Sequence, residues 1–168
     1  AVIRPVTTIT MQRVVQMPAK TNPFNLTTKR HNSSEVKRML NNSKNILLTL
    51  SLSDKFGDQG IVGICIALRD EKNEGGMFID SFLLSCRAIG RTAENVLWVA
   101  LLKQLEKINI SVLRASYVPS SKNMQVSGLF ERLGMDVELT NGSETKYVLN
   151  LPLNIDFPAW IGVDISSL

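Results

Sequence analysis

One long apolar segment, from Met77 to Cys86, constrains the fold more than any other part of this sequence. Both of its faces are mostly apolar, with Phe78, Phe82 and Leu84 on one and Met77, Ile79 and Leu83 on the other. A strand of this kind is covered by other elements on both sides. The segment therefore predicts a strand in the middle of a sheet.

A helical pattern follows this strand after Gly90. Apolar residues recur at the helical period, at Ala93, Val96, Leu97, Ala100, Leu101, Leu105 and Ile108. Thr92 is a suitable N-cap for this helix, and Val112 to Tyr117 is typical of a further strand. Because strand, helix and strand in this order form a right-handed crossover, we expect two parallel neighbouring strands. We also expect them to splay apart at their carboxyl ends.

The remaining elements are short. Helices are expected at Arg13 to Met17, ended by Pro18, at Ser34 to Leu40, capped by Ser33 or Ser34, and at Val126 to Leu133, closed by Gly134. Strands are expected at 24–27, 46–52, 61–68, 137–139 and 147–151, with hairpin turns at 56–60 and 141–142. This order predicts an α+β domain with a mixed sheet and flanking helices.

The expected domain limits leave both ends of the chain outside this sheet. Residues 21–151 form the predicted domain, residues 1–20 are a tail or the remnant of a preceding domain, and residues 152–168 are a C-terminal tail. The opening Ala-Val-Ile-Arg and the apolar residues 160–163 favour a fragment of a longer polypeptide. Because there is no run of roughly 18 apolar residues and no secretory signal, we expect a cytoplasmic protein with no membrane contact.

Composition limits the chemistry further. The two cysteines are too few for a disulfide framework or a zinc site, so no metal is expected, and Cys65 is interpreted as core. The net charge of +4 is modest, and the basic residues are only loosely clustered. This suits an acidic protein partner or phosphates better than nucleic acid.

The segment from Ser85 to Thr92 is a candidate phosphate loop between the central strand and the best helix. Gly90 lets the backbone N–H groups point at one place, with the positive end of the helix behind them. Arg87 and Arg91 would add charge-assisted contacts. The alternative interpretation of the same glycine is a plain turn.

The run Arg87-Ala88-Ile89-Gly90-Arg91-Thr92 resembles the R/Q-x-x-G-x-G/A loop of the GNAT acyltransferase superfamily. That loop holds the pyrophosphate or phosphopantetheine end of an acyl thioester cofactor. The resemblance implies a GNAT-like fold and, as cofactor, coenzyme A or the phosphopantetheine of an acyl carrier protein. It also implies that Arg87, Gly90, Arg91 and Thr92 bind this cofactor, although Thr92 stands where Gly or Ala is usual.

Four sequence blocks carry a narrower resemblance. They are K-T-N-P-F-N-L-T-T-K-R at 20–30, D-K-F-G-D-Q-G-I-V-G at 54–63, F-L-L-S-C-R-A-I-G-R at 82–91 and Y-V-P-S-S-K-N at 117–123. In the same order, they are similar to K-T-N-Q-F-N-x-T-T-R-R, D-R-F-G-D-x-G-x-x-G, F-L-x-S-C-R-V-L-G-R and Y-x-P-T-x-K-N of FkbH-like proteins.

This resemblance implies the second half of a two-part enzyme, in which a HAD-like phosphatase half precedes a GNAT-like half. The family's reaction takes a phosphorylated glycerate to glyceryl bound to an acyl carrier protein, a step towards methoxymalonyl units in polyketide biosynthesis. The sequence has no D-x-D-x-T-like motif of the phosphatase half. The implied partners are therefore an acyl carrier protein and an upstream HAD-like phosphatase domain.

Four residues are candidates for catalysis. The Cys86 thiolate could take up an acyl group as a nucleophile, or its side chain could line the pantetheine arm. Asp80, which an even spacing places on the same strand face as Cys86, is either a general base or half of a structural pair. Asp54 and Asp58 flank a turn, where aspartate needs no function, and only the resemblance favours them.

Other candidates concern the cofactor and proton transfer. Lys122 could bind a phosphate and Asn123 a pantetheine amide, with helix capping as the alternative. Many GNAT enzymes have a tyrosine general acid where this chain has Phe130, although Tyr117 could replace it. His31 lies in a charged stretch and is interpreted as a surface residue.

The expected function is transfer of a glyceryl or similar small acyl group to the pantetheine thiol of an acyl carrier protein. One alternative is an acetyl-coenzyme A-dependent N-acetyltransferase. Another is a non-catalytic module that docks the carrier.

Overall fold

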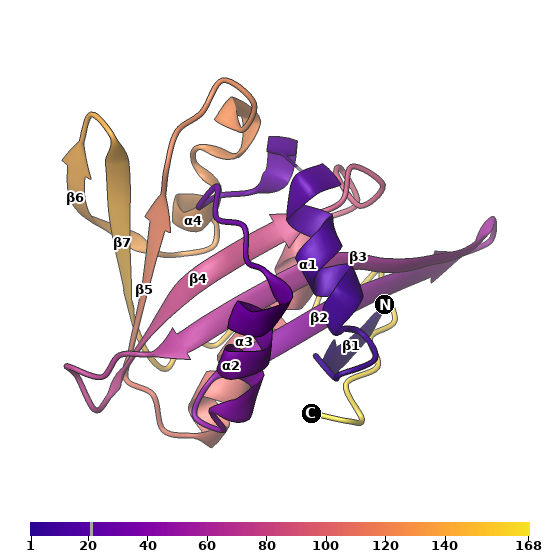
Figure 1. Cartoon of the computed structure of the whole chain (residues 1–168), viewed down its shortest axis with the longest axis horizontal. Coiled ribbons are helices and arrows are strands. Elements are labelled where there is room, and N and C mark those ends of the chain that lie inside the picture. The colour runs from indigo at the N-terminus through magenta and orange to yellow at the C-terminus, as the bar shows by residue number, and fades with distance from the viewer. Residues whose placement is uncertain (21) are drawn as a thin grey trace.

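The computed structural model describes residues 1–20 and 22–168 as a seven-stranded mixed sheet with helices on both faces (Figure 1). The strands are β1 (Val2–Pro5), β2 (Ile46–Asp54), β3 (Gly57–Arg69), β4 (Gly76–Leu84), β5 (Val112–Tyr117), β6 (Asp136–Asn141) and β7 (Glu144–Asn150). The helices are α1 (Met11–Lys20), α2 (Ser33–Asn41), α3 (Ala93–Lys107) and α4 (Leu129–Arg132), with 3-10 turns η1 (Asn22–Phe24) and η2 (Met124–Val126). The strand order β1-β2-β3-β4-β5-β7-β6 makes β4 central, as the sequence predicts.

The strands β4 and β5 are parallel neighbours joined by α3. They pair only between 76–78 and 112–114, although both strands continue beyond these residues. The two strands therefore splay apart toward their carboxyl ends, which confirms the prediction from the crossover.

A segment from before α2 bridges the splayed strands, and we call residues 24–31 the strap. The Leu26 N–H donates to the Phe82 carbonyl of β4 at 3.4 Å, and the Val118 N–H donates to the Leu26 carbonyl at 2.9 Å. Asn25 also forms a single antiparallel bridge with Leu83 of β4. The short strand expected at 24–27 is therefore one bridge that follows η1.

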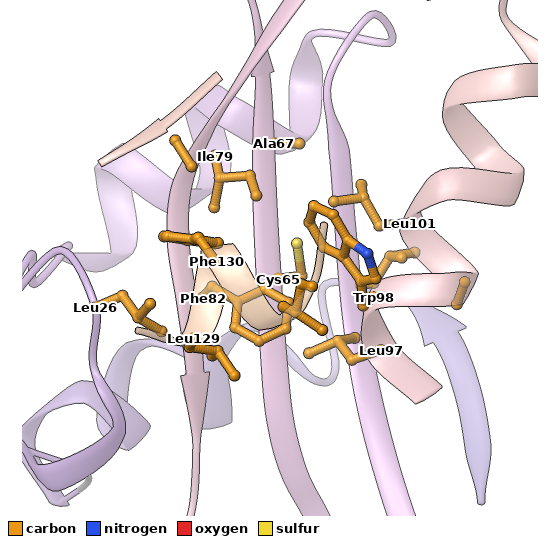
Figure 2. Packing of buried hydrophobic residues seen from close by; sticks show 14 of the residues in the cluster. Leu26, Cys65, Ala67, Ile79, Phe82, Leu97, Trp98, Leu101, Leu129 and Phe130 are labelled. Atoms are coloured by element: carbon orange, nitrogen blue, oxygen red, sulfur yellow. The ribbon is translucent and has the colours of Figure 1, made fainter. Parts of the chain in front are cut away.

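Two hydrophobic layers hold the helices to the sheet. One face is covered by α1 and α2. The buried residues of this layer include Val14, Met17 and Val36 from the helices and Ile64 and Leu83 from the sheet. The opposite face is covered by α3 and α4, and there Cys65 lies among Phe82 and Trp98 (Figure 2). Phe82 meets Trp98 edge to face at 6.5 Å between ring centroids. Cys65 is fully buried, which confirms its interpretation as core.

Three predicted helices differ in detail from the structure. The helix α1 continues through Pro18 to Lys20, because a proline this near the helix end removes only one late hydrogen bond. The helix α2 begins with a capping box of Asn32 and Glu35, and not with a serine cap. The helix expected at 126–133 is divided into η2 and the four-residue α4.

Both ends of the chain pack on this sheet. In residues 1–20, expected outside the domain, β1 pairs with β2 and α1 contributes to the same hydrophobic layer as α2. In residues 152–168, Leu153, Phe157 and Ile161 pack on the large cluster under α3. The Asp164 N–H donates to the Ala1 carbonyl at 2.9 Å, so the two ends also meet each other.

Candidate functional site

The loop of residues 85–92 leaves the carboxyl end of β4 and leads into α3. Gly90 has a φ of +78°, which favours glycine, and no other group lies within 4 Å of where a Cβ would stand. The N–H groups of Ala88 and Arg91 bond inside the loop, to the carbonyls of Ser85 and Ala88 at 2.9 and 3.2 Å. The loop is thus a tight turn with open space at Gly90, and the positive end of a fifteen-residue helix follows it.

The two arginines of this loop have different surroundings. Arg91 Nη1 lies 2.6 Å from Asp54 Oδ2, at the end of β2. This hydrogen bond lowers the pKa of Asp54 below its usual value. Arg87 is exposed, and in the described part of the chain no group pairs with its guanidinium. Arg87 is therefore the cation available to a phosphate, whereas Arg91 joins the loop to the β2–β3 hairpin.

Thr92 does not cap α3, contrary to the prediction. Its φ is +53°, and its hydroxyl donates to the Arg91 carbonyl at 2.7 Å and accepts from Trp160 Nε1 at 3.1 Å. A β-branched residue in this left-handed region is strained. Because no side chain caps α3, its first N–H groups are left for water or a ligand.

Asp54 and Asp58 both hold the β2–β3 hairpin. Asp54 Oδ1 accepts from the Phe56 N–H at 2.8 Å, and Asp58 Oδ1 accepts from the Gly60 N–H at 2.7 Å. These are the turn roles that aspartate fills without any further function. Only Asp54 is also joined to the candidate phosphate loop, through Arg91.

Cys86 lies at the start of the loop and is exposed. The even spacing that placed it on the same face as Asp80 does not apply, for two reasons. The pairing of β4 with β3 shifts register between Ile79 and Ser81, which leaves Asp80 as an extra residue. In addition, β4 ends at Leu84, before Cys86 is reached.

Three side chains of the strap converge on Asp80, which is 4% exposed. Asp80 Oδ2 lies 2.5 Å from His31 Nε2, and its Oδ1 accepts from Lys29 Nζ at 2.8 Å. The Thr27 hydroxyl donates to the Asp80 carbonyl at 2.8 Å, and the Ser81 hydroxyl donates to Oδ2 at 3.0 Å. Asp80 is therefore part of a structural ion pair, which is one of the two alternatives predicted for it.

The cluster shifts two pKa values in opposite directions. Burial raises the pKa of Asp80, but the hydrogen bonds from His31 and Lys29 outweigh burial and lower that pKa to about 2. The hydrogen bond to Asp80 raises the pKa of His31 above its ordinary 6.5, and burial offsets this only in part. A carboxylate bonded to one ring nitrogen fixes the orientation of the imidazole, so that the other nitrogen can accept a proton in a defined direction.

His31 and Lys29 were missed as site residues at the level of sequence, and the assignment of His31 to the surface was wrong. Its side chain is only 15% exposed. Strand alternation gives no signal for Thr27, Lys29 and His31, because Thr28 has a φ of +57° and interrupts any extended segment between them. Their common partner on β4 follows only from the fold.

A cleft of about 450 Å³ opens beside Lys29. Its walls come from the strap, from β4 and β5, and from the β6–β7 hairpin, and Phe78 contributes an apolar surface. Among its charged residues, Arg114 pairs with Glu138 at 3.4 Å and Lys146 with Glu144 at 3.9 Å. The cleft can therefore receive a small polar group that carries charge of either sign.

Asn123 is fully buried and has no group left for a cofactor. Its Nδ2 donates to the carbonyls of Asn25 and Val118 at 2.9 and 3.0 Å, and its Oδ1 accepts from the Ser120 N–H at 2.8 Å. It does not cap η2, and instead fastens the strap to the end of β5. Lys122, by contrast, is exposed.

Phe130 and Tyr117, the two positions considered for a general acid, are buried on the α3 and α4 side. Phe130 is fully buried and packs against Phe82 and Tyr147. The Tyr117 hydroxyl donates to Asn123 Oδ1 at 3.2 Å, and burial raises the pKa of this tyrosine. Tyr117 therefore has a structural partner inside the protein.

Residues 1–20 and 22–168 contain neither a cluster of metal-ligating side chains nor a membrane-spanning helix. No group of three or more His, Cys, Asp or Glu residues within these ranges could hold a metal ion. None of the helices described is both long and apolar enough to cross a lipid bilayer.

Comparison with known proteins identifies the fold. No family model matches this sequence, and no curated protein is similar to it. Among solved structures, the ribosomal-protein-S18-alanine N-acetyltransferase of Escherichia coli has a TM-score of 0.63 at 13% identity, over 94% of this chain and 96% of that one. A putative GNAT acetyltransferase of Desulfovibrio desulfuricans has a TM-score of 0.69 at 12% identity, over 88% and 97%.

A third structure was solved with a ligand. The PaiA N-acetyltransferase of Thermoplasma acidophilum, in complex with coenzyme A, has a TM-score of 0.68 at 13% identity, over 89% of this chain and 98% of that one. These similarities establish the mixed sheet with flanking helices as the GNAT acyltransferase fold, which confirms the predicted fold class.

Proposed function

We propose that this domain transfers a glyceryl or similar small acyl group to the pantetheine thiol of an acyl carrier protein. The observation that carries the proposal is the loop at Gly90. Its positive φ, the open space beside it and the exposed Arg87 form a place for the phosphate that begins a pantetheine arm. The four blocks that resemble FkbH-like proteins narrow the acyl group to glyceryl.

The surface around the loop supports a protein carrier over free coenzyme A. Phe56, at the tip of the β2–β3 hairpin, is 81% exposed, and Trp160, bonded to Thr92, is 72% exposed. Lys55 lies over the Phe56 ring at 4.9 Å. Exposed aromatic rings with cations beside them fit the surface of an acidic protein. An upstream HAD-like phosphatase domain would be the second partner.

In the proposed reaction, the pantetheine sulfur forms a bond to the acyl carbon of an activated acid. The thiol proton passes to a base, and the leaving group departs with its bonding electrons. We assign the base to His31, because Asp80 fixes its orientation and stabilises the imidazolium that forms. Cys86 lines the start of the arm in this arrangement.

The test uses a glyceryl thioester of coenzyme A as donor and a carrier with its pantetheine attached. We expect the intact mass of the carrier to increase by one glyceryl group in the presence of this domain. The same carrier without pantetheine is the control and should gain nothing. If the loaded carrier is not formed, the transfer proposal is wrong.

One observation favours a second function, N-acetylation by acetyl-coenzyme A. The cleft beside Lys29 is lined by Asp70, Glu138 and Glu144, which could attract an ammonium group. Lys29 also contacts Asp80, so the His31–Asp80 pair lies next to this cleft and could take up a proton from the amine. In an assay with acetyl-coenzyme A and a panel of amines, thiol release without loading of the carrier would favour this alternative.

A further inference from the structure

A polar hollow lies at the carboxyl end of β5, and none of the chemistry above uses it. Its volume is about 280 Å³, and its lining residues are Asn25, Thr28, Arg30, Ser120, Ser121 and Lys122. One wall is the strap, and the other is the turn that follows β5. Because β4 and β5 are parallel, this turn and the loop at Gly90 both follow carboxyl ends of the same strand pair.

The strap separates this hollow from the Asp80 cluster. Thr27, Lys29 and His31 contact Asp80, whereas the alternate residues Thr28 and Arg30 line the hollow. The strap is not a regular strand here, because Thr28 has a φ of +57° and the chain turns at this residue. One short segment therefore serves two distinct places.

The charges of the hollow are positive. Arg30 contributes a guanidinium from one wall and Lys122 an ammonium from the other, and the remaining lining residues are neutral. Two cations and two serine hydroxyls within a space of this size form the donor set that proteins use for small oxyanions.

Asn25, one of the residues that line the hollow, has an unsatisfied acceptor. Asn25 is 3% exposed, and no donor within the described residues reaches its Oδ1, although its Nδ2 donates to the Lys29 carbonyl at 3.2 Å. A buried amide oxygen is normally hydrogen-bonded, so one left without a donor calls for an explanation. A hydroxyl group of a ligand would supply that donor.

We propose that the hollow binds a small molecule that carries an oxyanion and, close to it, a free hydroxyl group. Arg30 and Lys122 bind the oxyanion, and the hydroxyl donates to Asn25 Oδ1. A phosphate ester and a carboxylate both have the required chemistry. The site does not depend on the proposed acyl transfer, because the strap and the turn after β5 form it without the loop at Gly90.

Two probes of similar size separate the two contacts. Glycerol 3-phosphate has an oxyanion and hydroxyls, whereas propyl phosphate has the oxyanion alone. We would titrate the ¹⁵N-labelled protein with each probe and follow the NMR chemical shifts of the backbone amides of Ser121 and Lys122. We expect these amides to shift and the affinity for glycerol 3-phosphate to be about tenfold higher. Glycerate in a third titration distinguishes a carboxylate from a phosphate.

Two variants assign the contacts. Lys122→Gln should lower the affinity for both phosphates about fivefold. Lys44→Gln, which changes an exposed lysine after α2, should leave both affinities unchanged. Asn25→Leu should reduce the preference for glycerol 3-phosphate to nearly nothing. Should this variant not fold, the side-chain amide signal of Asn25 in the natural protein should move with glycerol 3-phosphate and not with propyl phosphate. Equal affinities for the two probes, or shifts confined to residues near Gly90, would overturn the proposal.

Discussion

The Nε2 atom of His31 lies 2.5 Å from Oδ2 of Asp80, across 49 residues of sequence. The contact joins the strap to the central strand β4 beside the bulge, and Lys29 adds a second cation to the same carboxylate. Because Asp80 is buried, its charge depends on these partners and on the Ser81 hydroxyl for stabilisation. The position of the strap therefore depends in part on one ionised group, and this contribution can be measured.

Replacement of Asp80 by asparagine should lower the free energy of unfolding by about 2–3 kcal/mol, below the usual cost of breaking a fully buried pair. The expected loss is smaller than usual because the Lys29 side chain is 48% exposed and can be solvated by water once the carboxylate is removed. Urea unfolding of Asp80→Asn against the natural protein measures the loss. Asp136→Asn, on the exposed strand β6, is the control and should change the free energy little. An equally stable Asp80→Asn protein would contradict the arrangement.

The pKa of His31 can be followed alone, because it is the chain's one histidine. NMR titration of its ring should give a pKa above 6.5, and Asp80→Asn should return it toward 6.5. Since the folded pKa is raised, the stabilisation from this pair is complete below pH 6.5 and is lost as the pH rises through the folded value. A ring that titrates below 6.5 in the natural protein would refute the pairing.

Acid should destabilise the protein by protonating Asp80, the partner of His31. The pKa of Asp80 is lowered to about 2 in the folded protein, so its contribution to stability is present above the unfolded value, near 4, and is lost as the pH falls toward 2. The free energy of unfolding should therefore decrease more steeply between pH 4 and pH 2 in the natural protein than in Asp80→Asn. Parallel curves would show that Asp80 is not held ionised.

The sequence predicted the parts of the fold that depend on local pattern. The continuous apolar run placed β4 in the centre, and the helical period of α3 led to the parallel pair with β5. The bulge at Asp80 could not be predicted in this way, because a register shift depends on the partner strand. The even spacing from Asp80 to Cys86 was misleading for that reason.

The sequence indicates the loop of the candidate site but not its charged cluster. Arg87 and Gly90 adjoin in sequence, so the loop could be found from one motif. His31 and Asp80 lie on separate elements, and only the strap's passage between β4 and β5 brings them together. The buried hydrogen bonds of Asn123 could not be predicted from the sequence either, since one of its partners, the Asn25 carbonyl, comes from a distant segment.

Gly90→Ala tests the backbone of the loop. A Cβ at Gly90 meets no atom, but its φ of +78° should make the alanine cost about 1 kcal/mol of stability. We also expect weaker binding of coenzyme A, measured by calorimetry, because the loop would adjust its N–H groups. Gly142→Ala is the matched control, since Gly142 is equally open and has no positive φ. Equal effects of both changes would remove the special role of Gly90.

The two loop arginines should differ in a binding assay. Arg87→Ala should lower the affinity for coenzyme A about fivefold and reduce the dependence of binding on salt. The reason is that an exposed charge-assisted contact to phosphate is removed. Arg91→Ala should weaken binding less and should raise the pKa of Asp54, its ion-pair partner. Affinities unchanged in both variants would count against a phosphate at this loop.

Cys86 and Cys65 offer an internal comparison of thiol chemistry. Cys86 is exposed at the start of the loop, whereas Cys65 is fully buried and burial raises the pKa of its thiol. Iodoacetamide should therefore modify the folded protein once, at Cys86, and modify Cys65 only after unfolding. Peptide mass spectrometry identifies the modified position. Early modification of Cys65 would mean that the core around Trp98 opens readily.

The same thiol separates a lining role from a nucleophilic one. Cys86 adjoins Arg87, so a bound phosphate would lie close to it and the far end of a pantetheine arm would lie well away. We therefore expect Cys86→Ser to load the carrier from the glyceryl thioester with at most a modest loss of affinity. Intact-protein mass spectrometry should find no glyceryl adduct on this domain, because a lining cysteine takes no acyl group. A glyceryl adduct on the natural protein that is absent from Cys86→Ser, together with loss of loading, would establish the nucleophile instead.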